Sequence, residues 1–162
     1  MTLPLRNGEQ ATVVPPSPGA SSPAVRSVMQ GNSKRGTRPE RALRSALHAR
    51  GLRFRIDLKI GDGRSAPRPD VVFQRAKVAV FVDGCYWHSC PDHGTTVATN
   101  GAYWSAKLAR NRRRDAENNE ALERLGWLVI RVWEHDDVDR AAEAISAAVH
   151  YALQLDTGRP AS

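Results

Sequence analysis

Residues 78–93 read VAVFVDGCYWHSCPDH, an apolar run followed directly by a dense group of reactive side chains. Val78 to Val82 is continuously apolar, which is typical of a strand covered on both faces of a sheet. Asp83 to His93 then contains two Asp, two Cys, two His, a Tyr and a Trp. A strand that only fills a core does not end in such a set, so the sequence predicts a functional site directly after this strand.

A second apolar segment, Asp70 to Phe73, precedes this strand by only residues 74–77, which fits a hairpin turn. Asp70 would begin one strand and Asp83 would end its antiparallel neighbour, so both carboxylates are expected at the same edge of the sheet. Carboxylate oxygens bind hard cations such as Mg²⁺, and a metal there could polarise a phosphodiester and activate water. The alternative is structural, because Pro-Asp is a common pair at the start of a strand. His88 favours the metal site, since a neutral imidazole beside it could act as the general base.

The rest of the chain predicts one α/β domain with a mixed β-sheet flanked by helices. Thr37 has the character of a helix cap with Pro39 in the first turn, and this helix is expected to end at Arg50. Alternating apolar and polar residues predict a strand over Leu52 to Leu58. The expected order is helix, three strands, helix, strand, helix. The last three of these elements are expected over residues 102–125, 127–133 and 138–155.

The two ends of the chain differ in composition from this domain. Residues 1–26 contain five Pro among Ser, Gly and Ala, so we expect a disordered leader there. The folded domain is expected over residues 27–155, followed by a disordered tail over residues 156–162.

The positive charge of the chain is concentrated in one region. The 162 residues carry a net charge of +7, while Lys34 to Lys77 holds 13 Lys or Arg against 4 Asp or Glu, which is +9. A basic surface attracts phosphates because binding releases their counterions, so this clustering favours a polyanion partner. A solvated, Arg-rich surface without a partner is the alternative.

Cysteine content and hydropathy indicate the compartment. Two cysteines occur and no secretory pattern precedes them, so we expect a reducing cytoplasm. No apolar run approaches the roughly 20 residues that a membrane helix requires. We therefore expect a soluble protein with no membrane partner.

Cys85, Cys90 and His93 form a C-x4-C-x2-H cluster, and thiolate and imidazole are ligands that zinc prefers. His135 follows the expected strand over residues 127–133, and pairing of that strand beside the apolar run would bring it close as a fourth ligand. Four ligands with no open position indicate a structural zinc that stabilises the loop. Free buried thiols and a Cys85 to Cys90 disulfide are the alternatives.

Three aromatic residues have an unusual setting. Tyr86 and Trp87 lie within the same loop, and Trp104 lies at the start of a helix segment rich in Lys and Arg. Aromatic rings on a rigid loop can wedge between base pairs, at an unstacking cost that favours weakened steps such as mismatches. Ordinary core packing of these rings is the alternative.

Four segments together resemble one known family. They are RPD at residues 68–70, VFVDGCYWHSCPDHG at 80–94, YWSAKLARNRRRD at 103–115 and GWLVIRVWEH at 126–135. In this order they resemble the very-short-patch repair (Vsr) endonucleases, from about Arg26 to His135. The resemblance implies a restriction-endonuclease-like fold. It also implies an enzyme that nicks duplex DNA beside the thymine of a T:G mismatch left by deamination of 5-methylcytosine.

The resemblance implies roles for individual residues. Asp70 would bind the catalytic Mg²⁺ and His88 would be the general base. Glu40 would support catalysis, and we expect Asp83 and the carbonyl of Val82 to help hold the metal. The DNA wedges would be Tyr86, Trp87 and Trp104, with Met29 acting from the opposite groove, and the Zn²⁺ ligands would be Cys85, Cys90, His93 and His135.

The sequence departs from the family pattern at Asp83, in the zinc ligand set, and at Pro67, which replaces a Gly common before the Arg-Pro-Asp element and could alter the approach of that loop to DNA. Asp83 stands where the best-known member carries a second active-site His, which favours a metal ligand over a proton carrier. In the zinc set, Cys and His exchange places within the loop and His135 replaces a Cys. Two thiolates with two imidazoles still form a normal zinc shell.

The implied enzyme would be a bacterial, cytoplasmic and nucleoid-associated monomer. Its partner would be double-stranded DNA containing a T:G mismatch, with mismatch-repair proteins as further partners. Two alternatives stay open: a restriction or modification-dependent endonuclease on the same fold, and a non-catalytic zinc-stapled DNA-binding module.

Overall fold

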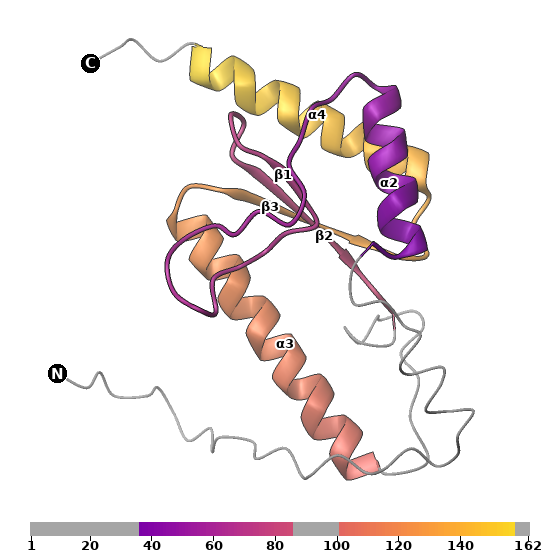
Figure 1. The fold of residues 1–162 in the computed structure, drawn as a ribbon, viewed down its shortest axis with the longest axis vertical. Coiled ribbons are helices and arrows are strands. Elements are labelled where there is room, and N and C mark those ends of the chain that lie inside the picture. Colours follow the sequence, from indigo (N-terminus) through magenta and orange to yellow (C-terminus); the bar gives the residue numbers. More distant parts are fainter. Residues whose placement is uncertain (1–35, 86–100, 158–162) are drawn as a thin grey trace, which may run out of the picture.

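The computed structural model describes residues 36–85 and 101–157 (Figure 1). The expected leader over residues 1–26, Met29 and the last residues of the expected tail lie outside the described residues. The same holds for five loop residues to which the sequence assigned roles: Tyr86, Trp87, His88, Cys90 and His93.

The described part of the chain contains a three-stranded sheet in the order β1-β2-β3. Strand β1 (Val71–Phe73) pairs antiparallel with β2 (Val78–Asp83), and β2 pairs parallel with β3 (Leu128–Trp133). The turn between β1 and β2 includes Lys77, whose φ of 50° lies in the left-handed region. The predicted hairpin and the mixed sheet are therefore confirmed.

The strand predicted over Leu52 to Leu58 is wrong. This segment makes one isolated bridge, between Arg55 and Val72, and forms no regular strand. Asp57 has a φ of 54°, which interrupts an extended backbone. Ile56, which the alternation had placed on the apolar side, is 53% exposed. The order within the described residues is therefore helix, two strands, helix, strand, helix.

Helix α2 (Arg38–Ala49) and helix α4 (Val138–Thr157) cover one face of the sheet. Thr37 is the N-cap of α2, as expected, and its hydroxyl accepts from the backbone N–H of Glu40. Leu43 of α2 and Ile145 of α4 pack in one buried cluster with Val80 of β2. Each fully buried aliphatic side chain of this kind contributes about 1.5–3 kcal/mol to folding. α4 runs to Thr157, two residues beyond its expected end at 155.

Helix α3 (Gly101–Arg124) covers the opposite face. Its buried Leu122 packs against Val72 of β1 and Ala79 of β2 in a second cluster. Only the second half of α3 lies along the sheet, and its first half runs out beyond it (Figure 1). β2 is thus buried between two helical layers, as its continuous apolar sequence predicted.

Within the described residues, no helix combines the length and the apolar character that crossing a membrane requires.

Candidate active site and nucleic-acid interface

Asp70 lies where the chain enters β1, beside the C-terminal end of β2. Its Oδ2 accepts a 2.8 Å hydrogen bond from the backbone N–H of Val82. No described residue donates to its second oxygen, Oδ1. The sequence placed Asp70 and the end of β2 at one edge of the sheet, and this bond confirms that arrangement.

Burial is the main influence on the ionisation of Asp70. Loss of solvent raises the pKa of its carboxyl from 3.8 to about 6, and the charges of Glu40 and Asp83 also raise it. The Val82 N–H and the Arg44 guanidinium act in the opposite direction. A carboxyl whose pKa is raised by burial and by neighbouring acids is typical of functional sites.

Glu40 is buried on the first turn of α2, where its carboxylate serves the start of the helix. It accepts from the backbone N–H of Gly36 at 2.7 Å and from the hydroxyl of Thr37 at 3.0 Å. Arg44 donates to Glu40 at 3.0 Å and also to the backbone carbonyl of Asp70 at 3.3 Å. Arg44 therefore connects the capped end of α2 to the residue that begins the hairpin.

Asp83, the last residue of β2, forms an ion pair with Arg131 of β3. Nη1 of Arg131 lies 2.8 Å from Oδ1 and 2.7 Å from Oδ2 of Asp83. The Asp83 side chain is only 6% exposed. The sequence predicted Asp83 as a metal ligand, and this ion pair is a competing use of the same oxygens.

The described carboxylates fit a Mg²⁺ site in part. Within residues 36–85 and 101–157, no three His, Cys, Asp or Glu side chains converge on one point where a metal ion could sit. Asp70 fits a single carboxylate ligand, because Oδ1 has no donor in the described part of the chain. Mg²⁺ commonly takes one or two carboxylates and completes its shell with phosphate oxygens and water. The donor set is therefore compatible with a metal that is completed by substrate.

Cys85 and His135 lie side by side just beyond the parallel strands β2 and β3. Sγ of Cys85 is 2.9 Å from Nδ1 of His135, and the backbone N–H of Cys85 donates to the carboxylate of Glu134 at 2.8 Å. The sequence predicted this approach from the pairing of the two strands, and it is confirmed. A thiol and an imidazole are ligand types that zinc prefers, but 2.9 Å is a hydrogen-bond distance, and the two atoms would separate to about 3.6 Å in a tetrahedral zinc shell. Cys90 and His93, the other two predicted ligands, lie outside the described residues.

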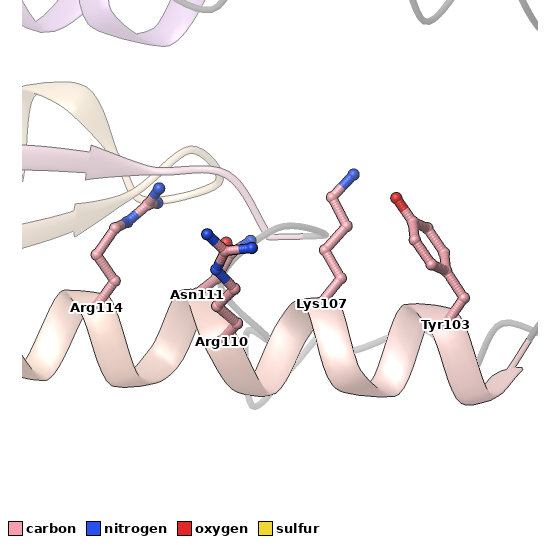
Figure 2. Close-up of a pocket in the computed structure, with 5 residues that line it drawn as sticks. All are labelled: Tyr103, Lys107, Arg110, Asn111 and Arg114. Atoms are coloured by element: carbon pink, nitrogen blue, oxygen red, sulfur yellow. The ribbon is translucent and has the colours of Figure 1, made fainter. Parts of the chain in front are cut away.

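The charged side chains in the first half of α3 are all basic. Residues 101–114 contain five Lys or Arg and no Asp or Glu. Several of these side chains line a pocket of about 220 Å³, and Figure 2 shows Tyr103, Lys107 and Arg114 projecting from the same side of the helix. Arg110 and Asn111 complete its lining. A basic groove of this kind suits the phosphates of a nucleic acid.

Trp104, a predicted DNA wedge, lies at the start of this basic half. It is half-buried, with its ring in an edge-to-face contact with Tyr103 at 5.2 Å between centroids. Nζ of Lys107 lies 4.9 Å from the Trp104 ring centroid. The structure thus places an aromatic pair beside the cationic side chains.

The sequence of this chain is similar to those of known endonucleases. The family described as DNA mismatch endonuclease Vsr matches residues 21–94. The type II nicking enzyme V.NaeI of Lentzea aerocolonigenes is 51% identical over 125 residues, which is 76% of this chain and 75% of that enzyme. The chain belongs to the Vsr family.

Two further relatives are also named as nicking or mismatch endonucleases. The type II nicking enzyme V.NmeDIP of Neisseria meningitidis serogroup C is 40% identical over 126 residues, 75% of this chain and 82% of that enzyme. The DNA mismatch endonuclease Vsr of Escherichia coli (strain K12) is 35% identical over 107 residues, 65% of this chain and 66% of that enzyme. As a Vsr-family protein, the chain is a DNA endonuclease and thus a hydrolase of phosphodiester bonds.

The sequence did not predict the two arginines that organise this Vsr-family site. Arg44 bridges Glu40 and Asp70, and Arg131 binds Asp83. The available signal was the strand register. Pairing of β2 with β3 places Arg131 beside Phe81, next but one to Asp83 and on the same face of the sheet.

Proposed function

We propose that this endonuclease nicks one strand of duplex DNA beside the thymine of a T:G mismatch produced by deamination of 5-methylcytosine. The observation that carries the proposal is the position of Asp70, a half-buried carboxylate of raised pKa beside the end of β2, after which the predicted His88 loop follows in the sequence. The basic half of α3 supplies a surface for the DNA backbone. Membership in the Vsr family supports the reaction class.

In the proposed reaction, the side chains of this chain hold the scissile phosphate and move one proton. Asp70 is the carboxylate that would hold Mg²⁺, with the carbonyl of Val82 as a further ligand. The metal, when bound, supplies a Lewis acid that stabilises charge on the phosphate oxygens. His88 takes the proton from the attacking water, and Glu40 keeps Arg44 and the start of α2 in place beside Asp70.

We propose that the mismatch is selected by aromatic wedges. Tyr86 and Trp87 follow Cys85 directly in sequence, and Trp104 stands on the basic helix beside Tyr103. Met29 would enter from the opposite groove. Unstacking is cheaper at a weakened base pair, so rings that must insert favour T:G over a normal pair.

We also propose a structural zinc bound by Cys85, Cys90, His93 and His135. The 2.9 Å approach of Cys85 to His135 supports it, because it brings a thiol and an imidazole together across two strands. The zinc would hold the loop that carries Tyr86, Trp87 and His88. A monomeric state and the docking of mismatch-repair proteins stay predictions.

A panel of end-labelled duplexes tests the proposal. The duplexes share one sequence and differ at a single position, which is T:G, C:G or T:A, and each is incubated with wild type and Mg²⁺. We expect a nick in the thymine strand of the T:G duplex only. Cutting of the fully paired duplexes at one sequence would instead indicate the restriction-type alternative, and tight binding without any nick would indicate the non-catalytic module.

A further inference from the structure

We propose that Arg131 is a positioning residue that fixes the C-terminal end of β2 to the DNA-contacting helix α3, and that Asp83 serves this ion pair rather than the catalytic metal. The proposal deepens the proposed function and rests on it, because it explains how the phosphodiester site and the DNA surface keep their relative positions. Nothing in the sequence motifs assigns a role to Arg131.

The contact between Arg131 and Asp83 is short, and its carboxylate side is almost closed to solvent, whereas the Arg131 side chain is 23% exposed. Nη1 of Arg131 reaches both carboxylate oxygens, at 2.8 and 2.7 Å, and the Asp83 side chain is 6% exposed. Charge-assisted hydrogen bonds of this length are among the strong ones in proteins. Both oxygens of Asp83 already accept from the positively charged guanidinium. A metal ion bound to the same carboxylate would bring a second positive charge close to the first.

The same guanidinium reaches α3 on its other side. Nε and Nη2 of Arg131 donate to Oδ1 of Asn119 at 3.2 and 3.1 Å, and Nη2 lies 3.7 Å from Oδ1 of Asp115. Asp115 and Asn119 are four residues apart, so they lie one above the other on one face of the helix. Phe81 of β2 supports the guanidinium from below, with 4.7 Å between Cζ and the ring centroid. Arg131 thus joins three elements, β2, β3 and α3.

The attachment lies at the point where α3 leaves the sheet. Leu122 packs on the sheet, and Arg131 holds Asn119 and Asp115. The residues that line the basic pocket lie further toward the start of α3, from Arg114 back to Tyr103. At 1.5 Å per residue, Tyr103 is about 18 Å along the axis from Asp115. A helix tilt of about 10° about Asp115 would therefore move the Tyr103 end of the pocket by about 3 Å. Displacements of about 1 Å can cost about 100-fold in rate when they misplace a substrate.

A double-mutant cycle separates this role from metal binding. The variants are Arg131→Met, Asp83→Asn and the double variant, with Arg131→Lys as the conservative change. The matched control pair is Arg50→Met and Asp139→Asn, because Arg50 and Asp139 form an ion pair of α2 with α4. For each protein, single-turnover nicking of the T:G duplex is measured as a function of Mg²⁺ and of DNA concentration, and folding is checked by circular dichroism and the thermal midpoint.

We expect Arg131→Met and Asp83→Asn each to slow nicking by about 10-fold or more, with the half-saturating Mg²⁺ concentration unchanged within about twofold. The double variant should be no slower than the slower single variant. Arg131→Lys should be faster than Arg131→Met but slower than wild type, because Lys keeps the charge but cannot contact Asp83 and Asn119 through separate nitrogens. The nicking rates of the control pair should stay within about twofold of wild type. Should Arg131→Met fail to fold, Arg131→Lys with Asp83→Asn completes the same comparison.

Two results would overturn the inference. One is a half-saturating Mg²⁺ concentration that rises tenfold or more in Asp83→Asn but not in the Arg131 variants, because this would make Asp83 a metal ligand. The other is wild-type nicking by Arg131→Met. Failure of the wild type itself to nick the T:G duplex would count against the proposed function instead, so the two failures are distinguishable.

Discussion

The carboxylate of Asp70 and the backbone N–H of Val82 are joined by a 2.8 Å hydrogen bond. This bond joins the residue before β1 to the end of β2 and holds Oδ2 of Asp70 against the backbone of β2. The other oxygen receives no donor from the described residues. A half-buried acid whose one oxygen is held by a backbone N–H, and whose other oxygen has no donor in the described part of the chain, is suited to bind a cation together with a phosphate.

Ionisation of Asp70 should destabilise the fold. Its folded-state pKa of about 6 lies above the ordinary value of 3.8, so the penalty is complete above pH 6 and disappears as the pH falls below 3.8. Asp70→Asn removes this charge and should therefore be more stable than wild type at pH 7. The advantage should shrink by about 2 kcal/mol between pH 7 and pH 4.5.

Urea unfolding of both proteins in Mg²⁺-free buffer at the two pH values measures this difference. The comparison between the two proteins cancels the titrating groups that do not interact with Asp70, whereas the carboxylates of Glu40 and Asp83 interact with it and titrate together with it. An advantage of Asp70→Asn that is equal at both pH values would contradict the burial of an ionisable Asp70.

Glu40 should have separable structural and functional roles. Gly36 and Thr37 donate to different oxygens of Glu40, so Glu40→Gln keeps an acceptor for only one of them, and its free energy of unfolding should fall by about 1 kcal/mol. The nicking rate of Glu40→Gln should fall by more than this loss of stability explains, because the ion pair between Glu40 and Arg44 beside Asp70 is lost. Thr37→Ala is the comparison: it removes the cap at a cost of about 1 kcal/mol and one hydrogen bond to Glu40 but keeps the Arg44 pair, so its nicking rate should fall less than that of Glu40→Gln. Equal nicking by Glu40→Gln and wild type would reduce Glu40 to a capping residue.

The zinc proposal predicts one zinc per chain in protein purified without chelator, measured by mass spectrometry of the metal. Cys85→Ser and His135→Ala should each lower the zinc content and the thermal midpoint together, because a structural metal contributes directly to folding. His150→Ala on α4 is a suitable control, since His150 is exposed and distant in sequence from the loop. Wild-type protein that contains no zinc would rule out the ligand assignment and leave the endonuclease activity untouched.

Arg110 and Arg114 should contribute to DNA binding through phosphates. Replacing either with Gln should reduce the slope of log affinity against log salt by about 1, because one fewer counterion is released. Arg124→Gln at the far end of α3 should leave the slope unchanged. Fluorescence anisotropy of a labelled duplex over a salt series measures these slopes. A slope in Arg114→Gln equal to that of wild type would remove the pocket from the interface.

Much of the fold was predictable because local signals and packing agreed. The Thr37 cap and the apolar run of β2 each depend on a few neighbouring residues. The strand expected over Leu52 to Leu58 failed because alternation describes side chains only, whereas Asp57 has a left-handed backbone. Pairing partners for that segment are also missing beyond a single bridge at Arg55 within the described residues.

The site was predictable where it depends on the hairpin and on strand order. These placed Asp70 near Val82, and Cys85 near His135. The pair of Arg131 with Asp83 was not predicted, because it depends on the register of two strands separated by the whole of α3. Motif spacing identifies reactive residues but does not show which of their oxygens are already bound to an arginine.

The most direct test of the central claim compares wild type with Asp70→Asn on a T:G duplex labelled on each strand, in saturating Mg²⁺ under single-turnover conditions. Wild type should nick the thymine strand beside the mismatch. Asp70→Asn should bind the same duplex with similar affinity and nick it at least roughly 10²–10³-fold more slowly, the scale for loss of one group that stabilises the transition state. Nicking by Asp70→Asn at the wild-type rate would contradict the account.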